Sequence, residues 1–201
     1  MTSVTHRVAA ALAAVAAALL LSSCSTPASD GHTGHEHADE PVITGQPAGY
    51  NADDVAFATN MIPHHKQAVD LSAMVPERST NAGLVALAQQ ISAAQQPEIN
   101  VMNVFLVQWN ENPDSNSGHG DHGNAMQGMV DAATMTKLES LTGAEFDKLW
   151  LESMISHHQG AIEMAKAEIA NGDNVDAKSL AKNIVTTQEA EVGQMKQMVG
   201  G

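Results

Sequence analysis

Hydrophobic side chains recur every three or four residues in four long segments of this chain, with polar residues between them. The segments cover about residues 51–75, 80–109, 142–170 and 175–199. This period places the hydrophobic side chains on one face of an α-helix. The pattern therefore predicts four amphipathic helices, and a short further helix is expected near residues 129–140.

Two of the predicted helices begin with residues that suit a capping box. Asn51 has a side chain that can cap a helix, and Asp54 follows three residues later. Thr142 and Glu145 have the same spacing at the start of the third long helix. In a capping box each of the two side chains accepts a hydrogen bond from an otherwise unpaired backbone N–H. We therefore expect a capping box at both starts.

Other boundaries follow from proline, hydroxyl and polar residues. The first helix is expected to stop before Pro76, because proline lacks the N–H that a helix needs. Ser79 or Thr80 is expected to cap the second helix. Residues 110–128 are polar and rich in His and Gly, which predicts a loop between the two halves, and NGDN at residues 171–174 predicts a turn.

The sequence repeats itself at an offset of 93 residues: MIPHH at residues 61–65 is matched by MISHH at residues 154–158. Further matches at this offset need no insertion; they include Ala68/Ala161, Asn81/Asn174, Leu87/Leu180, Ile91/Ile184, Gln95/Gln188, Glu98/Glu191 and Met102/Met195. Each half, at about residues 51–109 and 142–199, is too small to bury its hydrophobic face alone. The repeat therefore predicts two helical hairpins that pair into an antiparallel four-helix bundle over residues 51–199.

The composition also favours an all-α fold. The chain has two Trp, one Tyr and three Phe, and aromatic residues make up 3% of it. Its hydrophobic residues are instead Ala, Leu, Ile, Val and Met. Strands are enriched in β-branched and aromatic residues, whereas Ala, Leu and Met are good helix formers.

The N-terminus has the pattern of an export leader. Arg7 precedes a hydrophobic run, Val8 to Leu21, that is short for a membrane span. The run ends in LSSC, which resembles a bacterial lipobox and predicts cleavage after residue 23 and lipidation of Cys24. Residues 24–50 would then form a flexible, His-containing tether from the membrane to the bundle, on the outer side of the membrane in the cell envelope. A plain secretory leader with an incidental cysteine is the alternative.

The net charge of the chain limits which kinds of molecule or ion it is expected to bind. The whole chain has a net charge of −14, and loss of Arg7 with the leader would make it −15. A strongly acidic exported chain is a poor candidate for binding nucleic acid and a reasonable one for binding cations. With Cys24 lipidated, the chain has no thiolate left for a metal, because Cys24 is its single cysteine.

Polar side chains lie on the stripe of each helix that should face the core. They are His64, His65, Gln95 and Glu98 in the first half and His157, His158, Gln188 and Glu191 in the second, with Met61, Met102, Met154 and Met195 beside them. A buried carboxylate needs a partner or a cation, and the histidines of the facing helix are the natural partners. Imidazole, carboxylate and thioether together suit a transition metal, and the thioethers favour copper, especially Cu(I). Gln95 and Gln188, or the glutamates, could orient histidines that do not bind the metal.

Two further groups of histidines lie in Gly-rich stretches outside the predicted helices. His32, His35 and His37 belong to the tether, and His119 and His122 to the loop between the halves. Such stretches can capture metal weakly, although a solvated polar linker has the same composition. The repeat is also broken at Pro63 and Pro97, which face Ser156 and Ala190 in the second half. We expect the first hairpin to bend there, unless its first helix begins later and Pro63 lies in the first turn.

At these residues the sequence resembles the bacterial family called domain of unknown function 305. The resemblance is carried by MIPHHKQAVDLSAM and MISHHQGAIEMAKA, each followed by a QQPEINVM or QEAEVGQM motif, and covers about residues 50–199. It implies a ferritin-like four-helix bundle in exported proteins, of which some members are linked to copper binding and tolerance. The Glu-x-x-His pairs of di-iron bundles are not found here, which argues against iron storage or oxidase chemistry.

The sequence thus predicts a lipid-anchored metal-binding protein of the cell envelope that sequesters, tolerates or delivers copper, as Cu(I) or Cu(II), or another transition metal. Two alternatives remain. One is a metal-dependent redox enzyme, which needs an open coordination position and a substrate pocket. The other is a structural envelope protein whose His–Glu network sets helix pairing without a metal. The sequence leaves open whether the chain forms a homo-oligomer.

Overall fold

The structure is a computed structural model that describes residues 49–111 and 127–200. The chain divides into Met1–Ile43 and a compact unit, Thr44–Gly201, which contains all the described residues. Several predictions therefore lie outside the described residues: the leader, the lipidation of Cys24, the tether with His32, His35 and His37, and the loop histidines His119 and His122.

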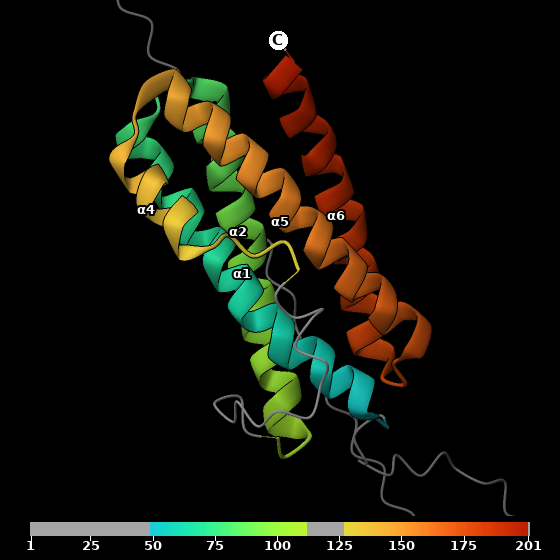
Figure 1. Ribbon diagram of the computed structural model, residues 1–201. Coiled ribbons are helices and arrows are strands. Elements are labelled where there is room, and N and C mark those ends of the chain that lie inside the picture. The colour runs from blue at the N-terminus through green and yellow to red at the C-terminus, as the bar shows by residue number, and fades with distance from the viewer. Residues whose placement is uncertain (1–48, 112–126, 201) are drawn as a thin grey trace, which may run out of the picture. The chain divides into compact units, whose positions relative to one another are not determined.

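The described residues form helices and no strand. The helices are α1 (Ala52–Arg78), α2 (Ala82–Gln108), the short α4 (Ala132–Ser140), α5 (Gly143–Asn171) and α6 (Val175–Gly200). The predicted all-α fold of two helical hairpins is confirmed, with α1 and α2 in the first hairpin and α5 and α6 in the second (Figure 1). None of these described helices is long and apolar enough to cross a membrane.

The two hairpins are joined by antiparallel packing of α1 on α5 (Figure 1). At one end Asn51, which caps α1, donates from Nδ2 to the carbonyl of Asn171 at the end of α5, at 2.9 Å. Further along, the buried indole N–H of Trp150 donates to the carbonyl of Leu71 at 2.8 Å. The start of α1 therefore lies beside the end of α5, and the later part of α1 lies beside the beginning of α5.

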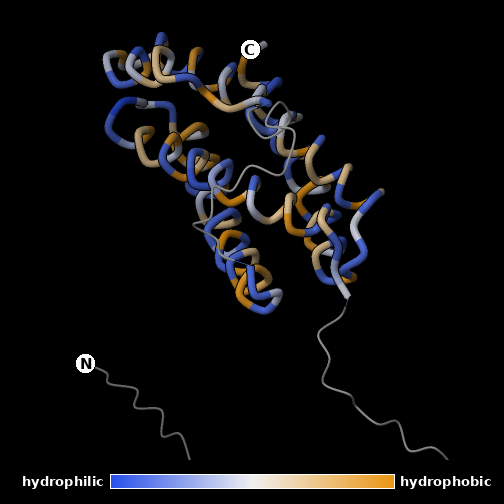
Figure 2. The backbone as a smooth tube through the Cα atoms, turned by 60° about the horizontal axis from the view of Figure 1, so that its bottom comes forward, coloured by the Kyte–Doolittle hydropathy of each residue, from blue (hydrophilic) through white to orange (hydrophobic). Residues whose placement is uncertain are grey.

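The hydrophobic core consists of two clusters, and each contains residues from both hairpins. One cluster is built from Leu71, Leu84, Leu87, Trp150, Met154 and Met195 with their neighbours, and the other from Phe57, Met61, Met102, Leu106, Ala161 and Ile184 with theirs. Every long helix contributes to both clusters. Hydrophobic and hydrophilic residues alternate along each of these helices (Figure 2). Neither hairpin therefore has a core of its own.

The helix starts agree only in part with the capping patterns. Asn51 and Asp54 form the predicted capping box. The second helix is capped by Asn81, whose Oδ1 accepts from the N–H groups of Gly83 and Leu84, so the prediction of Ser79 or Thr80 was wrong. Ser79 instead ends α1, where its N–H donates to the carbonyl of Val75.

The capping box predicted at Thr142 was also wrong. Thr142 precedes the first residue of α5, but its side chain makes no capping hydrogen bond. The next residue, Gly143, has φ = 62°, in the left-handed region that glycine adopts readily. A first residue in this conformation departs from the geometry of an ordinary first helical turn, in which the cap side chain reaches the free N–H groups.

Prolines lie inside α1 and α2 without ending them. Pro63 and Pro76 belong to α1, and Pro97 to α2. The prediction that α1 ends before Pro76 was wrong, because Val75 is fully buried and its packing outweighs the loss of one backbone hydrogen bond. The alternative of a later start for α1 was wrong too, since α1 begins at Ala52 and Pro63 lies beyond its third turn.

Candidate metal centre

A layer of polar side chains separates the two hydrophobic clusters at the middle of the bundle. Along α1, α2 and α6 the polar residues come between those of one cluster and those of the other, and on α5 only Ile162 departs from this order. The buried members are His64, His65, Gln95, His157, His158, Gln188 and Glu191, each no more than 2% exposed, while the side chain of Glu98 is 17% exposed. The predicted placement of these residues inside the bundle is confirmed.

Two histidines of the layer are paired with carboxylates within their own hairpins. His65 Nε2 lies 2.9 Å from Glu98 Oε2, and His158 Nε2 lies 2.8 Å from Glu191 Oε2. A carboxylate oxygen accepts a hydrogen bond, so Nε2 carries the hydrogen in both rings. In the neutral ring the lone pair is then on Nδ1, and no described residue forms a hydrogen bond with Nδ1 of either histidine. The predicted His–Glu partnership is confirmed in both halves.

The other two histidines face each other across the contact between the hairpins. The ring centroids of His64 and His157 are 3.8 Å apart, with planes inclined by 39°. Burial, with a smaller contribution from His65, lowers the pKa of His64 to about 4. Burial, followed by repulsion from His64, also puts the pKa of His157 well below its ordinary value. Both rings are therefore neutral at pH 7 and carry lone pairs that a metal ion can use.

The ring nitrogens of this layer are the feature that fits a metal. In each of the four histidines, Nδ1 has no hydrogen-bond partner among the described residues. The same is true of Nε2 of His157. A network that serves only to fix helix pairing should satisfy its buried polar atoms, because each unsatisfied one costs free energy. Neutral imidazole nitrogen is a good donor for copper and for other late transition metals.

The described part of the chain does not contain a ready-made cage of three or more His, Cys, Asp or Glu side chains. The carboxylates are engaged by His65 and His158, which leaves His64 and His157 as a pair of imidazoles. A metal that binds here would take this pair and would need softer or additional donors to complete its coordination.

The methionines border the layer on both sides. Met61 and Met102 belong to one hydrophobic cluster, and Met154 and Met195 to the other, and all four are fully buried. Ligation by their sulfur atoms stays a prediction. Both polar atoms of the Gln95 amide and Oε1 of Gln188 have no partner among the described residues, so the proposed orienting role of these two glutamines stays a prediction as well.

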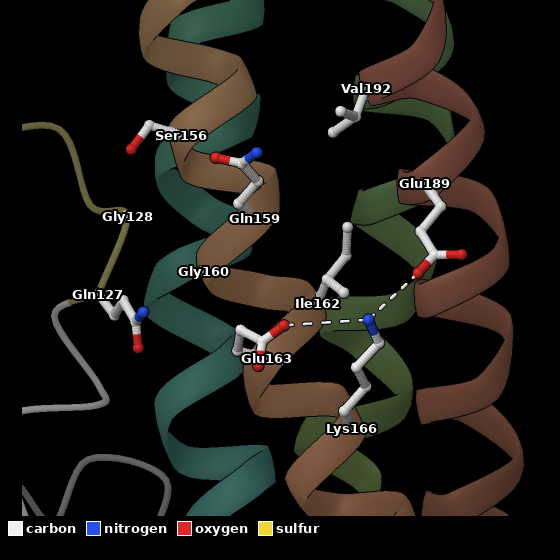
Figure 3. Close-up of a pocket in the computed structure, with 10 residues that line it drawn as sticks. All are labelled: Gln127, Gly128, Ser156, Gln159, Gly160, Ile162, Glu163, Lys166, Glu189 and Val192. Atoms are coloured by element: carbon white, nitrogen blue, oxygen red, sulfur yellow. Dashed lines mark ion pairs between the residues drawn. The ribbon is translucent and has the colours of Figure 1, made fainter.

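Residues 127–130 also contribute to the site, and the sequence did not predict this. The main-chain carbonyl of Gln127 accepts a hydrogen bond from His64 Nε2 at 3.2 Å. Beside it lies a pocket of about 430 Å³ between α5 and α6, where Lys166 is 3.9 Å from Glu163 and 3.3 Å from Glu189 (Figure 3). A main-chain carbonyl leaves no signal in residue type, and only the capacity of Gly160 for close backbone approach could have indicated this contact.

The fold and site define a class: helical bundles made of two related hairpins that bury a histidine and carboxylate layer at their centre. The sequence profile of the domain of unknown function DUF305 matches residues 54–199. The chain belongs to this family.

Solved structures of relatives have the same fold. A DUF305 protein of Streptomyces coelicolor, described as secreted, is 31% identical, with a TM-score of 0.69 over 74% of this chain and 92% of that one. CopM in its Cu(II)-bound form is 31% identical, with a TM-score of 0.63 over 73% of this chain and 95% of CopM. CopM is also known in Cu(I)-bound and silver-bound forms. An uncharacterized protein of Acanthamoeba polyphaga mimivirus is 39% identical over 54 residues, so the match spans 36% of that protein.

Proposed function

We propose that this protein binds copper at the His64–His157 pair, to sequester the ion, confer tolerance to it or pass it on. The observation that carries the proposal is the contact of two buried, neutral imidazoles whose Nδ1 atoms have no hydrogen-bond partner among the described residues. The comparison with CopM supports copper as the metal, because CopM was crystallised with Cu(I) and Cu(II).

Cu(I) is the oxidation state that the surroundings favour. Cu(I) is a soft ion that accepts few ligands, and imidazole and thioether both suit it. The layer offers two neutral imidazoles, and four buried methionines border it. The hydrophobic clusters on both sides would keep water away from the bound ion. His65 and His158, which the glutamates hold, would complete or support the coordination.

We place this activity at the outer side of a membrane. The lipobox-like LSSC motif supports lipidation of Cys24, and the secreted relative from Streptomyces coelicolor supports export. The histidines of the tether and of the loop, His32, His35, His37, His119 and His122, would collect metal at low affinity and raise its concentration near the bundle.

The test is a competition for Cu(I) between the unlipidated chain, residues 25–201, and a chromogenic chelator. We expect the double variant His64→Ala and His157→Ala to lose the tight site. A matched variant with all five tether and loop histidines changed to alanine should keep it. Circular dichroism checks that each variant retains its helices. Tight Cu(I) binding by the folded double variant would refute the assignment.

A thermal scan separates metal binding from a purely structural network. A ligand that binds the folded state raises the Tm, by an amount that grows with its concentration above Kd. We expect Ag(I), a redox-inert substitute for Cu(I), to raise the Tm of the wild type but not that of the double variant. Equal melting temperatures with and without Ag(I) in the wild type would favour the structural alternative.

A further inference from the structure

Residues 127–130, which we call the strap, are held against α1 beside the histidine pair. Gln67 Nε2 donates to the carbonyl of Val130 and Gln67 Oε1 accepts from its N–H, each at 2.8 Å. One turn earlier on α1, His64 Nε2 lies 3.2 Å from the carbonyl of Gln127. Both ends of the strap are therefore fixed to α1, one of them through a proposed metal ligand.

The opposite side of the strap lies directly on the backbone of α5, as the positions of Gln127, Gly128 and Gly160 in Figure 3 indicate. A Cβ atom at Gly160 would collide with the carbonyl of Gln127. Gly128 has φ = 82°, and a Cβ there would come within 2.6 Å of the carbonyl of Ser156. Two glycines thus permit an approach that no other residue would allow.

The residues that contact the strap from α1 and from α5 occupy equivalent positions of the internal repeat. The offset of 93 residues pairs Gln67 of α1 with Gly160 of α5. The histidines three positions before them, His64 and His157, are identical, whereas this pair differs. Gln67 clamps the strap with two hydrogen bonds, and Gly160 leaves room for its backbone. The strap is a single segment, so it contacts α1 with one of its sides and α5 with the other. The same position of the repeat therefore needs a hydrogen-bonding side chain on α1 and no side chain on α5.

We propose that the strap positions His64 for metal binding: the Gln127 carbonyl fixes the hydrogen on Nε2 and leaves Nδ1 as the metal-binding nitrogen. This inference rests on the proposed function. A carbonyl oxygen is only an acceptor, so the contact selects one tautomer and one ring orientation. Glu98 and Glu191 select the same tautomer in His65 and His158. Metal-binding histidines typically donate their second ring N–H to such an oxygen.

The test uses Gly160→Ala, which displaces the strap, and Gln67→Ala, which removes its clamp. The matched control is Gly193→Ala in α6, where an added Cβ meets nothing within 4 Å. Both glycine variants gain the same intrinsic helix propensity, so they differ in the collision with Gln127. In the metal-free, ¹⁵N-histidine-labelled protein, two-bond ¹H–¹⁵N spectra report the tautomer of each ring, and His64→Gln assigns the His64 signals.

We expect His64 in the wild type and in Gly193→Ala to carry its hydrogen on Nε2. In Gly160→Ala and Gln67→Ala it should become a mixture of tautomers, while His65 and His158 stay unchanged. The affinity for Cu(I) should fall about tenfold in the same two variants, as for loss of other supports of metal-binding histidines. An unchanged His64 tautomer, or a Cu(I) affinity equal to that of Gly193→Ala, would overturn the inference. If the wild type binds no Cu(I), the proposed function fails instead, and the metal-free tautomers still show whether the strap orients His64.

Discussion

Asp54 and Glu168 are two buried carboxyl groups that meet where α1 begins and α5 ends, and they have opposite protonation. They are 0% and 1% exposed. Burial alone would raise the pKa of Asp54, but N–H donors from Asn51, Asn174 and Asp173 and a hydrogen bond from Glu168 lower it overall. Burial, with the neighbouring Asp54, raises the pKa of Glu168 to about 8. Near neutral pH Glu168 therefore keeps its proton, whereas the neighbouring Asp54 is ionised.

This pair predicts a dependence of stability on pH. The folded protein keeps the Glu168 proton up to about pH 8, whereas the unfolded chain loses it near the ordinary value of 4.5. Between these values the folded state binds more protons, so this group lowers the free energy of unfolding as the pH rises. Glu168→Gln should remove the effect, and its stability relative to the wild type should increase from pH 4.5 to pH 8 by up to a few kcal/mol.

Urea unfolding at several pH values measures this difference. Glu163→Gln, at an exposed glutamate on the same helix, is the control and should follow the wild type at every pH. Parallel stability curves for Glu168→Gln and the wild type would show that Glu168 does not retain its proton in the folded protein.

At the scale of residues, the sequence predicted contacts that depend on side chains which repeat. His65–Glu98 and His158–Glu191 were predictable because both halves carry the pair at one spacing. The pairing of Asp54 with Glu168 was not, since Asp54 already had a complete explanation as part of a capping box. The Gln127 carbonyl was not predictable because every residue type presents the same main-chain oxygen.

At the scale of helices, hydrophobic periodicity predicted each long helix, while helix ends depended on a choice between similar residues. Ser79, Thr80 and Asn81 can all cap a helix, and the sequence does not say which one follows the turn. The structure uses Ser79 to end α1, and Asn81 is then free to cap α2. The prediction that Pro76 ends α1 was wrong, because the burial of Val75 is a tertiary effect that the local sequence pattern does not measure.

Replacing the proline inside α2 is expected to stabilise the folded protein. Pro97 is exposed, and the repeat places Ala190 at the equivalent position of α6. Pro97→Ala restores a backbone donor in the helix interior, so we expect it to raise the free energy of unfolding by about 2 kcal/mol. The reverse change, Ala190→Pro, should destabilise the protein by a similar or larger amount.

Chemical denaturation of both variants gives the two free energies. A loss of stability in Pro97→Ala would mean that the bend expected at this proline is required by the packing around Glu98. The bend itself stays a prediction.

At the scale of the whole molecule, the repeat predicted two hairpins but not how they join. The sequence of one hairpin does not indicate which of its two helices packs against the equivalent helix of the other hairpin. In the structure α1 packs on α5, and the choice brings His64 and His157 together while Gln90 Nε2 of α2 lies 3.4 Å from Glu191 of α6. The division of the core into two clusters around a polar layer follows from this pairing and was not predicted.

The predicted lipid anchor can be tested on the intact chain in a bacterial host that processes lipoproteins. Cys24 is the only residue that a lipobox could modify, because the chain has a single cysteine. We expect the wild type in the membrane fraction and Cys24→Ser in the soluble fraction of the envelope or in the medium. Immunoblots of the fractions measure this distribution, and equal distribution of both proteins would exclude lipidation as the anchor.

The contact between His64 and His157 also bears on the origin of the molecule. The two histidines occupy equivalent positions of the repeat, and their rings contact each other where the two halves meet. Two separate copies of a single hairpin, placed like the halves, would bring one histidine from each copy to a twofold axis. Gene fusion of such a homodimer would make the contact between the two histidines independent of protein concentration. It would also allow Gln67 and Gly160 to diverge, which a symmetric ancestor encoded by one short gene could not do.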